Sequence, residues 1–311
     1  MPTLRALECL VAVVEAGSIT DAASALHTSQ PAVSHQLATL EREVGTALFE
    51  RLPRGVRLTT AGRAVERDAR ASVAAAERVV RAGRAVAAGR GGQLRLGCAQ
   101  TLTTTLVAPV LRAWRRRHPA VAVTLSEATS ADDLARALDA GELDLAVAPR
   151  PSRWDGALTV VGTEEVVLAM ATDHPLAALT AGPVPYARLD GQAAVHYRAD
   201  IGLAGWLDAR LAEHGARLEV TLRTGQVGAA AQLASAGLGI ALAPVSSLGA
   251  SFPGALRRLE PPLRREIVVL VANPADRLAG RFAEGLAAHG IRVPRAIAAE
   301  LEPPPAGAPG V

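Results

Sequence analysis

Hydrophobic positions at the start of the chain repeat with helical spacing and are separated by short turns. Leucine and valine recur every three or four residues over 4–16, which predicts a helix that ends at Gly17. Ser18, followed three residues later by Asp21, forms a capping box for a second, alanine-rich helix over 19–26. Two short helices joined so tightly indicate a small helical domain.

A third helix is predicted over 29–44, with proline in its first turn and Gly45 as its C-cap. Together with the second helix it has the arrangement of a helix-turn-helix. Two short apolar segments at 49–52 and 56–58 surround the turn at 53–55, which predicts a two-stranded wing.

The polar side chains at the start of the third helix are candidates for reading DNA bases, because short side chains there reach base edges in a major groove. These residues are Thr28, Ser29, Gln30, Pro31, Ser34 and His35. Alternatively, Thr28 and Ser29 only cap the helix, and His35 contacts a phosphate or only water. On the wing, Arg51 and Arg54 are candidates for phosphate contacts, or are simply solvated.

A long arginine- and alanine-rich helix is predicted from residue 60 to about 88. Its apolar and small residues follow a heptad seam of Val65, Ala69, Ser72, Ala76, Val79, Gly83 and Val86. A lone helix with so thin an apolar stripe is unstable, which favours a dimer through this seam. The alternative is an amphipathic helix that packs on its own globular domain.

After the glycine-rich segment 89–92, strands alternate with helices, which predicts an α/β domain with a mostly parallel sheet. The predicted strands are 94–98, 121–126, 143–148, 158–161, 166–171, 193–195, 218–222, 239–243 and 266–271. The predicted helices are 106–117, 131–140, 203–214, 229–236 and 275–289. The proline- and glycine-rich tail, 303–311, is expected to be disordered.

The amino-acid composition limits the kinds of chemistry that this chain can perform. All 33 basic residues are arginine, and they concentrate in the long helix: residues 60–90 carry seven arginines and three acids, whereas residues 91–311 balance. The absence of lysine excludes a Schiff base or a P-loop lysine. Two cysteines and seven scattered histidines give neither a disulfide framework nor metal-ligand spacing, so we expect no metal and no cofactor. No secretory signal or membrane span is recognised, so we expect a cytoplasmic protein.

The run AGSITDAASALHTSQPAVSHQLATLEREVGTALFERLPRGVRLTTAG resembles the N-terminal domain of the LysR-type transcriptional regulators. The resemblance covers Leu4 to about Gly62 and includes the turn, the third helix and the wing. Further on, GELDLAV at 141–147 and AGLGIALAP at 236–244 resemble the same family more loosely.

The resemblance implies three parts: a winged helix-turn-helix over 1–59, a linker and dimerisation helix over 60–89, and an effector-binding domain over 90–302. The last part would resemble a type-2 periplasmic binding protein, with lobe I at about 93–162 and 267–302 and lobe II at about 163–266. The chain would cross between lobes near 161–166 and 263–268. Expected partners are promoter double-stranded DNA, a small-molecule effector, further copies of the chain as a dimer or tetramer, and RNA polymerase.

A small carboxylate or other anion is the expected effector, because free N–H groups at strand–helix junctions bind anions. The residues at such junctions are Gln100, Thr101, Leu102, Thr103, Ser130, Pro149, His196, Arg198, Gln226 and Val227. Two alternatives stay open: Thr101 and Thr103 only cap a helix, and Arg198 pairs with a surface acid. Cys98, late on a predicted buried strand, is either a redox sensor or an inert buried thiol.

Two other classes of function fit less well. An α/β enzyme would need a nucleophile elbow, a dinucleotide-binding motif or a paired acid and base, and the sequence has none. A solute-binding protein for a transporter would suit the second half, but residues 18–62 oppose it. The sequence therefore predicts a DNA-binding regulator with no catalytic residues.

Overall fold

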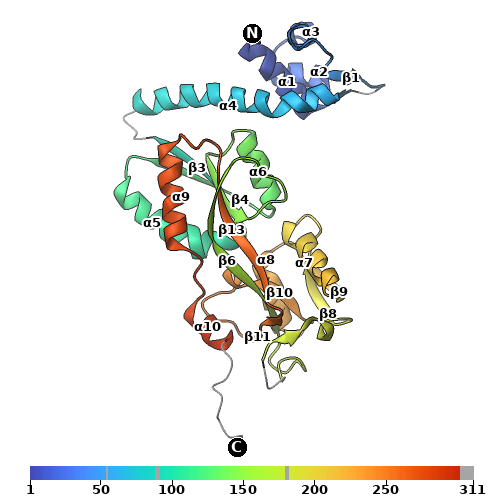
Figure 1. Ribbon diagram of the computed structural model, residues 1–311, viewed down its shortest axis with the longest axis vertical. Coiled ribbons are helices and arrows are strands. Elements are labelled where there is room, and N and C mark those ends of the chain that lie inside the picture. The colour runs from blue at the N-terminus through green and yellow to red at the C-terminus, as the bar shows by residue number, and fades with distance from the viewer. Residues whose placement is uncertain (54, 88–91, 179–181, 302–311) are drawn as a thin grey trace, which may run out of the picture. The chain divides into compact units, whose positions relative to one another are not determined.

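The computed structural model describes residues 1–53, 55–87, 92–178 and 182–301, and the chain forms two compact units (Figure 1). The first unit comprises residues 1–93 with 120–122 and 136–143, and the second comprises 94–119, 123–135 and the chain from 144 onward. The predicted tail and Arg54 lie outside the described residues, as do positions 89–91 of the predicted hinge.

Three helices and a wing make the first unit, as the apolar pattern predicts. The elements are α1 (Leu4–Ala16), α2 (Ile19–Ala25), α3 (Gln30–Val44), β1 (Phe49–Arg51), β2 (Val56–Leu58) and α4 (Thr60–Ala87). Ser18 caps α2 and Gly17 ends α1 in the left-handed conformation, so the predicted boundaries are confirmed. Leu10, Val13 and Val33 are fully buried where the first three helices meet.

The helix α4 packs against this small core with its first turns. Ala69 is 4% exposed within the core, and Val65 packs against it. Arg70 fixes the same stretch, since its guanidinium lies 2.5 Å from the Glu15 carboxylate of α1. In the first turns of α4, Ala69 therefore packs in the core of its own unit, as the alternative of an amphipathic helix on its own domain expects. Its role as a dimer contact stays a prediction.

Farther along α4 the seam leaves the core. Val79 is 73% exposed and its neighbour Val80 is 51% exposed, whereas Ala76 is half-buried. Val86 lies within the helix, but its side chain is outside what the structure describes. Two adjacent exposed valines on a helix are an apolar surface without a partner in the described part of this chain.

The large sheet of the second unit is mixed and has the order β10-β6-β13-β5-β3-β4, and β11 also pairs with β6. The strands are β3 (Gln93–Ala99), β4 (Ala122–Ala128), β5 (Leu145–Pro149), β6 (Ala157–Met170), β10 (Ala241–Pro244), β11 (Ala255–Arg257) and β13 (Leu263–Val271). β3 and β5 are parallel, but β13 is antiparallel to both β5 and β6, and β10 is antiparallel to β6. The prediction of a mostly parallel sheet is therefore wrong.

The long strand β6 replaces the two separate strands that the sequence predicts at 158–161 and 166–171. It pairs with β13 along the whole length of β13, from Val166 opposite Leu263 to Ala157 opposite Val271. Its second half also pairs with β10 and β11. The pair of β6 and β13 thus joins two parts of the sheet: β13 pairs with β5 on one side, and β6 pairs with β10 on the other.

Helices cover the sheet and a second, smaller sheet. They are α5 (Ala108–Arg117), α6 (Ala131–Asp139), α7 (Gly202–Glu213), α8 (Val227–Ser235), α9 (Arg277–His289) and α10 (Arg295–Leu301). α9 lies beside α5 (Figure 1), where the Trp114 ring meets Phe282 edge-on at 5.2 Å. The parallel pair β8 (Ala193–Tyr197) and β9 (Glu219–Thr224) forms the smaller sheet, and Tyr197 is buried in its core with Leu207 of α7.

Four short elements were not predicted: α10, β11 and the parallel pair of two-residue strands β7 (Val184–Pro185) and β12 (Leu259–Glu260). A turn of 3-10 helix (Gln100–Leu102) and a π-helical turn (Thr103–Val107) extend α5 toward the end of β3. Residues 99–103 thereby come to the edge of the sheet where β3 ends.

We predict that Gly62→Ala destabilises the first unit by roughly 1–3 kcal/mol, because a larger side chain overpacks this site. A Cβ atom on Gly62 would lie 2.2 Å from the Leu48 carbonyl oxygen and 2.7 Å from the Leu58 side chain. Calorimetry of the full chain measures the change. The matched control is Gly83→Ala in the same helix, where nothing lies within 4 Å. It should be neutral or slightly stabilising, and equal effects of the two changes would contradict the prediction.

Candidate functional site

The start of α3 presents a polar face to solvent. Gln30, Pro31 and His35 are exposed, and Ser34 is half-exposed. The Gln30 side-chain amide donates to the Ser34 hydroxyl at 3.1 Å, one helical turn away. The two side chains are therefore held together on one solvent-facing side of α3. A molecule that contacts this side of the helix could form hydrogen bonds with them.

Residues before α3 serve mainly as its cap. The Ser29 hydroxyl accepts from the Ala32 N–H at 3.4 Å, which places this side chain in the capping role that the sequence left open. Thr28 is half-buried, and its backbone N–H donates to the Ala23 carbonyl. His27 before it has a positive φ of 51°, so the turn between α2 and α3 is tight.

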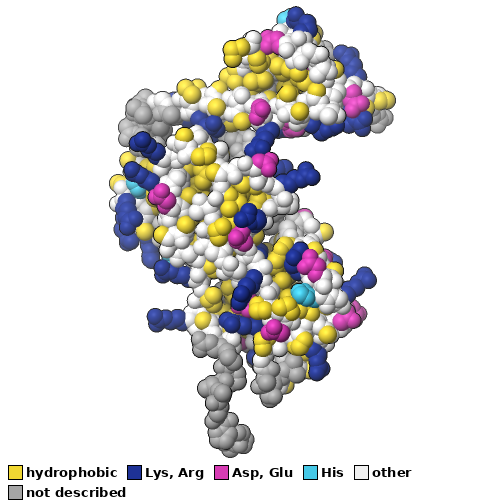
Figure 2. Space-filling model, viewed as in Figure 1, with side chains coloured by type: hydrophobic (Ala, Val, Ile, Leu, Met, Phe, Trp, Pro, Cys, Tyr) yellow, Lys and Arg dark blue, Asp and Glu magenta, His cyan; other side chains and the backbone are white. Residues whose placement is uncertain are grey.

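On the wing, the antiparallel strands β1 and β2 place their arginines in solvent. Arg51 is exposed and has no ion pair among the residues described. Arg57 of β2 is instead paired with Glu50 across the strands at 2.8 Å. Among the described arginines of β1 and β2, Arg51 is thus the one available to a phosphate. Over the face visible in Figure 2, arginines are spread widely and mixed with acidic side chains, so net charge alone marks no binding surface.

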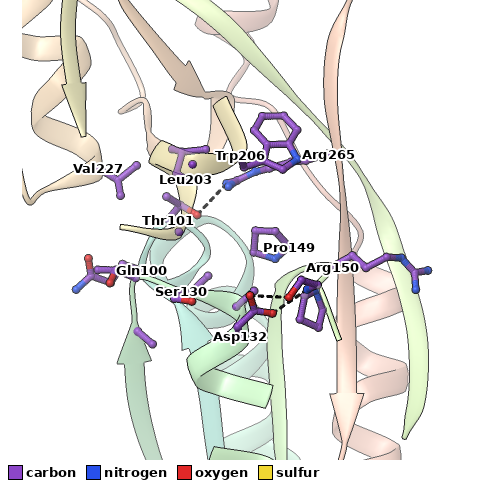
Figure 3. A pocket seen from close by; sticks show the side chains of 18 of the residues that line it. Gln100, Thr101, Ser130, Asp132, Pro149, Arg150, Leu203, Trp206, Val227 and Arg265 are labelled. Carbon is purple, nitrogen blue, oxygen red and sulfur yellow. Dashed lines mark hydrogen bonds between the residues drawn. The ribbon is translucent and has the colours of Figure 1, made fainter. Parts of the chain in front are cut away.

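A cavity of about 800 Å³ lies in the second unit, where several strands end. One side is formed by the ends of β3, β4 and β5, and the other by α7, α8 and β13 (Figure 3). Its wall includes Gln100, Thr101, Ser130, Asp132, Pro149, Arg150, Leu203, Trp206, Val227 and Arg265. We call this cavity the pocket. It is large enough for a small organic molecule.

Five of the ten predicted effector residues line the pocket, namely Gln100, Thr101, Ser130, Pro149 and Val227. Thr101 does not cap a helix: its hydroxyl accepts from the Arg265 guanidinium at 3.3 Å. Arg265 in turn lies 2.7 Å from the carboxylate of Glu164, which is fully buried. The pocket wall therefore includes a charged side chain that is only 8% exposed.

The other five predicted residues do not line the pocket. Leu102 is fully buried, and the Thr103 hydroxyl donates to Glu127 of β4. His196 is buried beside α7, with its Nε2 atom 3.4 Å from Asp208. Arg198 pairs with Asp200 at 2.7 Å, which is the surface acid that the sequence left as an alternative.

Gln226 is the last of these five, and it is exposed just before α8. Position next to a strand end thus does not decide which way a side chain points.

Sequence reasoning missed Asp132, Trp206 and the arginines of β13. Asp132 accepts from both the backbone and the hydroxyl of Ser152, at 2.7 and 2.9 Å, and so ties the start of α6 to the loop after β5. Arg264 and Arg265 begin the apolar strand β13, inside the predicted crossing 263–268. Two adjacent charges before a buried strand were the available signal.

Both cysteines are buried, at 1% exposure for Cys9 and 0% for Cys98. Burial raises the pKa of Cys98 to about 12, although the Thr103 hydroxyl, 3.6 Å from its sulfur, acts to lower it. Burial likewise raises the pKa of Cys9. Low thiolate content opposes a redox role, because the thiolate is the reactive form. The inert-thiol alternative for Cys98 is therefore favoured.

The described residues contain no cluster of three histidine, cysteine or carboxylate side chains that could hold a metal ion. None of their helices combines the length and apolar character needed to cross a membrane.

Comparison with protein families matches both units. Residues 4–63 match the bacterial regulatory helix-turn-helix protein model of the lysR family, and residues 87–297 match the LysR substrate binding domain. The HTH-type transcriptional regulator BudR of Raoultella terrigena is 32% identical over 248 residues, which cover 78% of this chain and 84% of BudR.

Solved structures share the fold over almost the whole length. A full-length OxyR variant from Pseudomonas aeruginosa has a TM-score of 0.61 at 22% identity, covering 91% of this chain and 94% of that one. Full-length CbnR, a LysR family regulator solved in complex with its target DNA, has a TM-score of 0.56 at 24% identity, covering 91% and 98%.

We predict that neither cysteine of the native protein reacts readily with the thiol reagent DTNB at pH 8. At this pH a thiol with a pKa near 12 is ionised to only about one part in ten thousand, and Cys98 has no exposed surface. Two equivalents should react once the chain is unfolded in guanidinium. The native Cys9→Ala variant isolates Cys98, and rapid labelling of that variant would restore the redox-sensor alternative.

Proposed function

Because this chain belongs to the LysR family of transcriptional regulators, we propose that α3 reads promoter DNA and that a small anion in the pocket sets the regulatory output. The family consists of regulators and not of enzymes, and its members combine a DNA-binding helix-turn-helix with an effector-binding domain. What is specific to this chain is which of its side chains perform each task.

The observation that carries the DNA-reading proposal is the exposed Gln30–Ser34 pair on α3. A glutamine amide can bond adenine through two hydrogen bonds, and a serine hydroxyl can pair with several bases. His35 is exposed one residue later, and Ser29 and Thr28 support the helix start. Arg51, without an ion pair among the described residues, adds a phosphate contact from the wing.

For the effector we propose a small organic anion. Three arginines, at positions 150, 264 and 265, line the pocket with two acids, Asp132 and Glu266. Arg150 is paired with Glu266 at 2.5 Å, but Arg264 has no ion pair within the described part of the chain. Leu203, Trp206 and Val227 supply apolar surface on the opposite wall (Figure 3), which suits the carbon skeleton of a carboxylate.

Assembly is proposed to use the far part of α4. Val79 and Val80 are exposed there, and burying such side chains against a second copy is favourable by roughly 1.5–3 kcal/mol each. Members of the family form oligomers; for this chain we propose a dimer through α4, assembling further into a tetramer that bends DNA and contacts RNA polymerase in the cytoplasm.

We predict that the double variant Gln30→Ala/Ser34→Ala loses preference for its operator by about 10- to 100-fold, since the bidentate contact that Gln30 can make contributes roughly 1–3 kcal/mol. Fluorescence anisotropy compares the DNA upstream of the chain's own gene with a scrambled duplex across a salt series. Binding to the scrambled duplex should stay unchanged, because it depends on phosphate attraction alone.

Arg51→Ala is the matched control on the wing. It should weaken binding to both duplexes equally and lower the salt slope by about one. The DNA-reading proposal fails if the double variant behaves like Arg51→Ala, or if native and scrambled duplexes bind alike with candidate effectors added.

We also predict that Val79→Glu weakens self-association about tenfold or more, because a charge would enter the apolar seam at a 73% exposed position. Sedimentation equilibrium measures the effect. Arg84→Glu, an exposed position five residues on, controls for charge alone. Unchanged association of Val79→Glu would exclude this part of α4 from the dimer interface.

A further inference from the structure

We propose that Arg265 is the residue that recognises the anionic group of the effector, and that the buried Glu164 positions it. This inference rests on the proposed effector pocket and deepens it. The observation behind it is the fully buried carboxylate of Glu164, which lies behind the wall of the pocket and is not required to form a cavity.

Strand pairing fixes the two side chains. Arg265 of β13 lies directly opposite Glu164 of β6 in the antiparallel register. The Arg265 Nε and Nη2 atoms lie 2.8 and 2.7 Å from the same oxygen of Glu164, Oε2. The other carboxylate oxygen accepts from the Ser246 N–H at 2.9 Å. Glu164 is thus satisfied on both oxygens, and one edge of the guanidinium is occupied.

The other N–H groups of the Arg265 guanidinium do not bond to Glu164. Nη2 also donates to the Thr101 hydroxyl at 3.3 Å, a long bond, and no hydrogen bond within the described residues uses Nη1. Arg265 lines the pocket, whereas Glu164 does not. Figure 3 shows the bond between Arg265 and Thr101. An arginine held on one edge by a carboxylate offers the Nη1–Nη2 edge to a second, planar oxyanion.

Electrostatics explain why Glu164 matters to a ligand that it does not touch. Its charge offsets that of Arg265, so the guanidinium attracts an anion less strongly than an unpaired arginine would. An effector carboxylate beside Thr101 would compete for Nη2. Replacing the Thr101 bond by a bond to the effector would change the first of a series of contacts. The series links Thr101 to Arg265, Arg265 to Glu164, and Glu164 to Ser246 after β10.

Three variants of the full-length protein test the inference. Glu164→Gln keeps an amide oxygen that can still accept from Arg265 and so position it, but it removes the buried negative charge, which should tighten anion binding about tenfold or more. The double variant Glu164→Gln/Arg265→Gln keeps an amide pair across the strands and the same net charge as the parent, so it should fold. It should bind anions at least about tenfold more weakly than the parent.

The matched control is Arg95→Gln/Asp144→Asn, which removes another ion pair of the same sheet, 2.6 Å apart and outside the pocket wall. It should leave anion affinity unchanged. Binding of acetate, benzoate, phosphate and sulfate is measured by calorimetry and by the shift in melting temperature, beside circular dichroism as a check on folding.

The outcomes separate this inference from the proposed function. If the parent binds one of these anions and the Glu164→Gln/Arg265→Gln variant binds it equally well, Arg265 is not the recognition residue, while the anion pocket stands. If the parent binds none of the four up to 20 mM while operator DNA still binds, the anionic effector is wrong and this inference falls with it. Opposite shifts in the single and double variants support it.

Discussion

The antiparallel pairing of β6 with β13 ties together the strands on which the effector-binding domain is built. β13 pairs on its other side with β5, and the second half of β6 pairs with β10 and β11. The same register sets Glu164 against Arg265. Burying either charge alone costs several kcal/mol, and a slip of one residue would turn the side chains to opposite faces. The ion pair therefore helps to specify the register of the strands that carry it.

The shape of the pocket depends on the pairing of β6 with β13, because β13 forms part of the pocket wall. Its wall comes from strand ends and helix starts that are far apart in sequence, and the bond between Gly202 N–H and the Thr129 carbonyl, at 3.2 Å, joins the start of α7 to the loop before α6. Local capping matters more in the first unit, where a small core leaves less apolar burial to stabilise three short helices.

Local signals in the sequence were sufficient for the first unit and insufficient for the second. The ends of α1, α2 and α3 follow from Gly17, Ser18 and Gly45, because each cap is decided by neighbouring residues. Strand direction in the large sheet is set by pairing between distant segments, so a mostly parallel sheet was the wrong expectation. Thr101 was found from its place after β3, but its partner Arg265 is 164 positions away. Such proximity leaves no local pattern.

In the proposed DNA-reading role of α3, the Gln30–Ser34 hydrogen bond bears on how fast a target is found as well as on how tightly it is held. A side chain that has no partner on the wrong sequence adds a penalty there, and that penalty sharpens discrimination. In the proposed role, one amide N–H of Gln30 is satisfied by Ser34, so the helix would meet non-cognate DNA with one donor fewer left unpaired. The energy landscape along the duplex would then be smoother, and the protein would trade some selectivity at each step for rapid movement between sites.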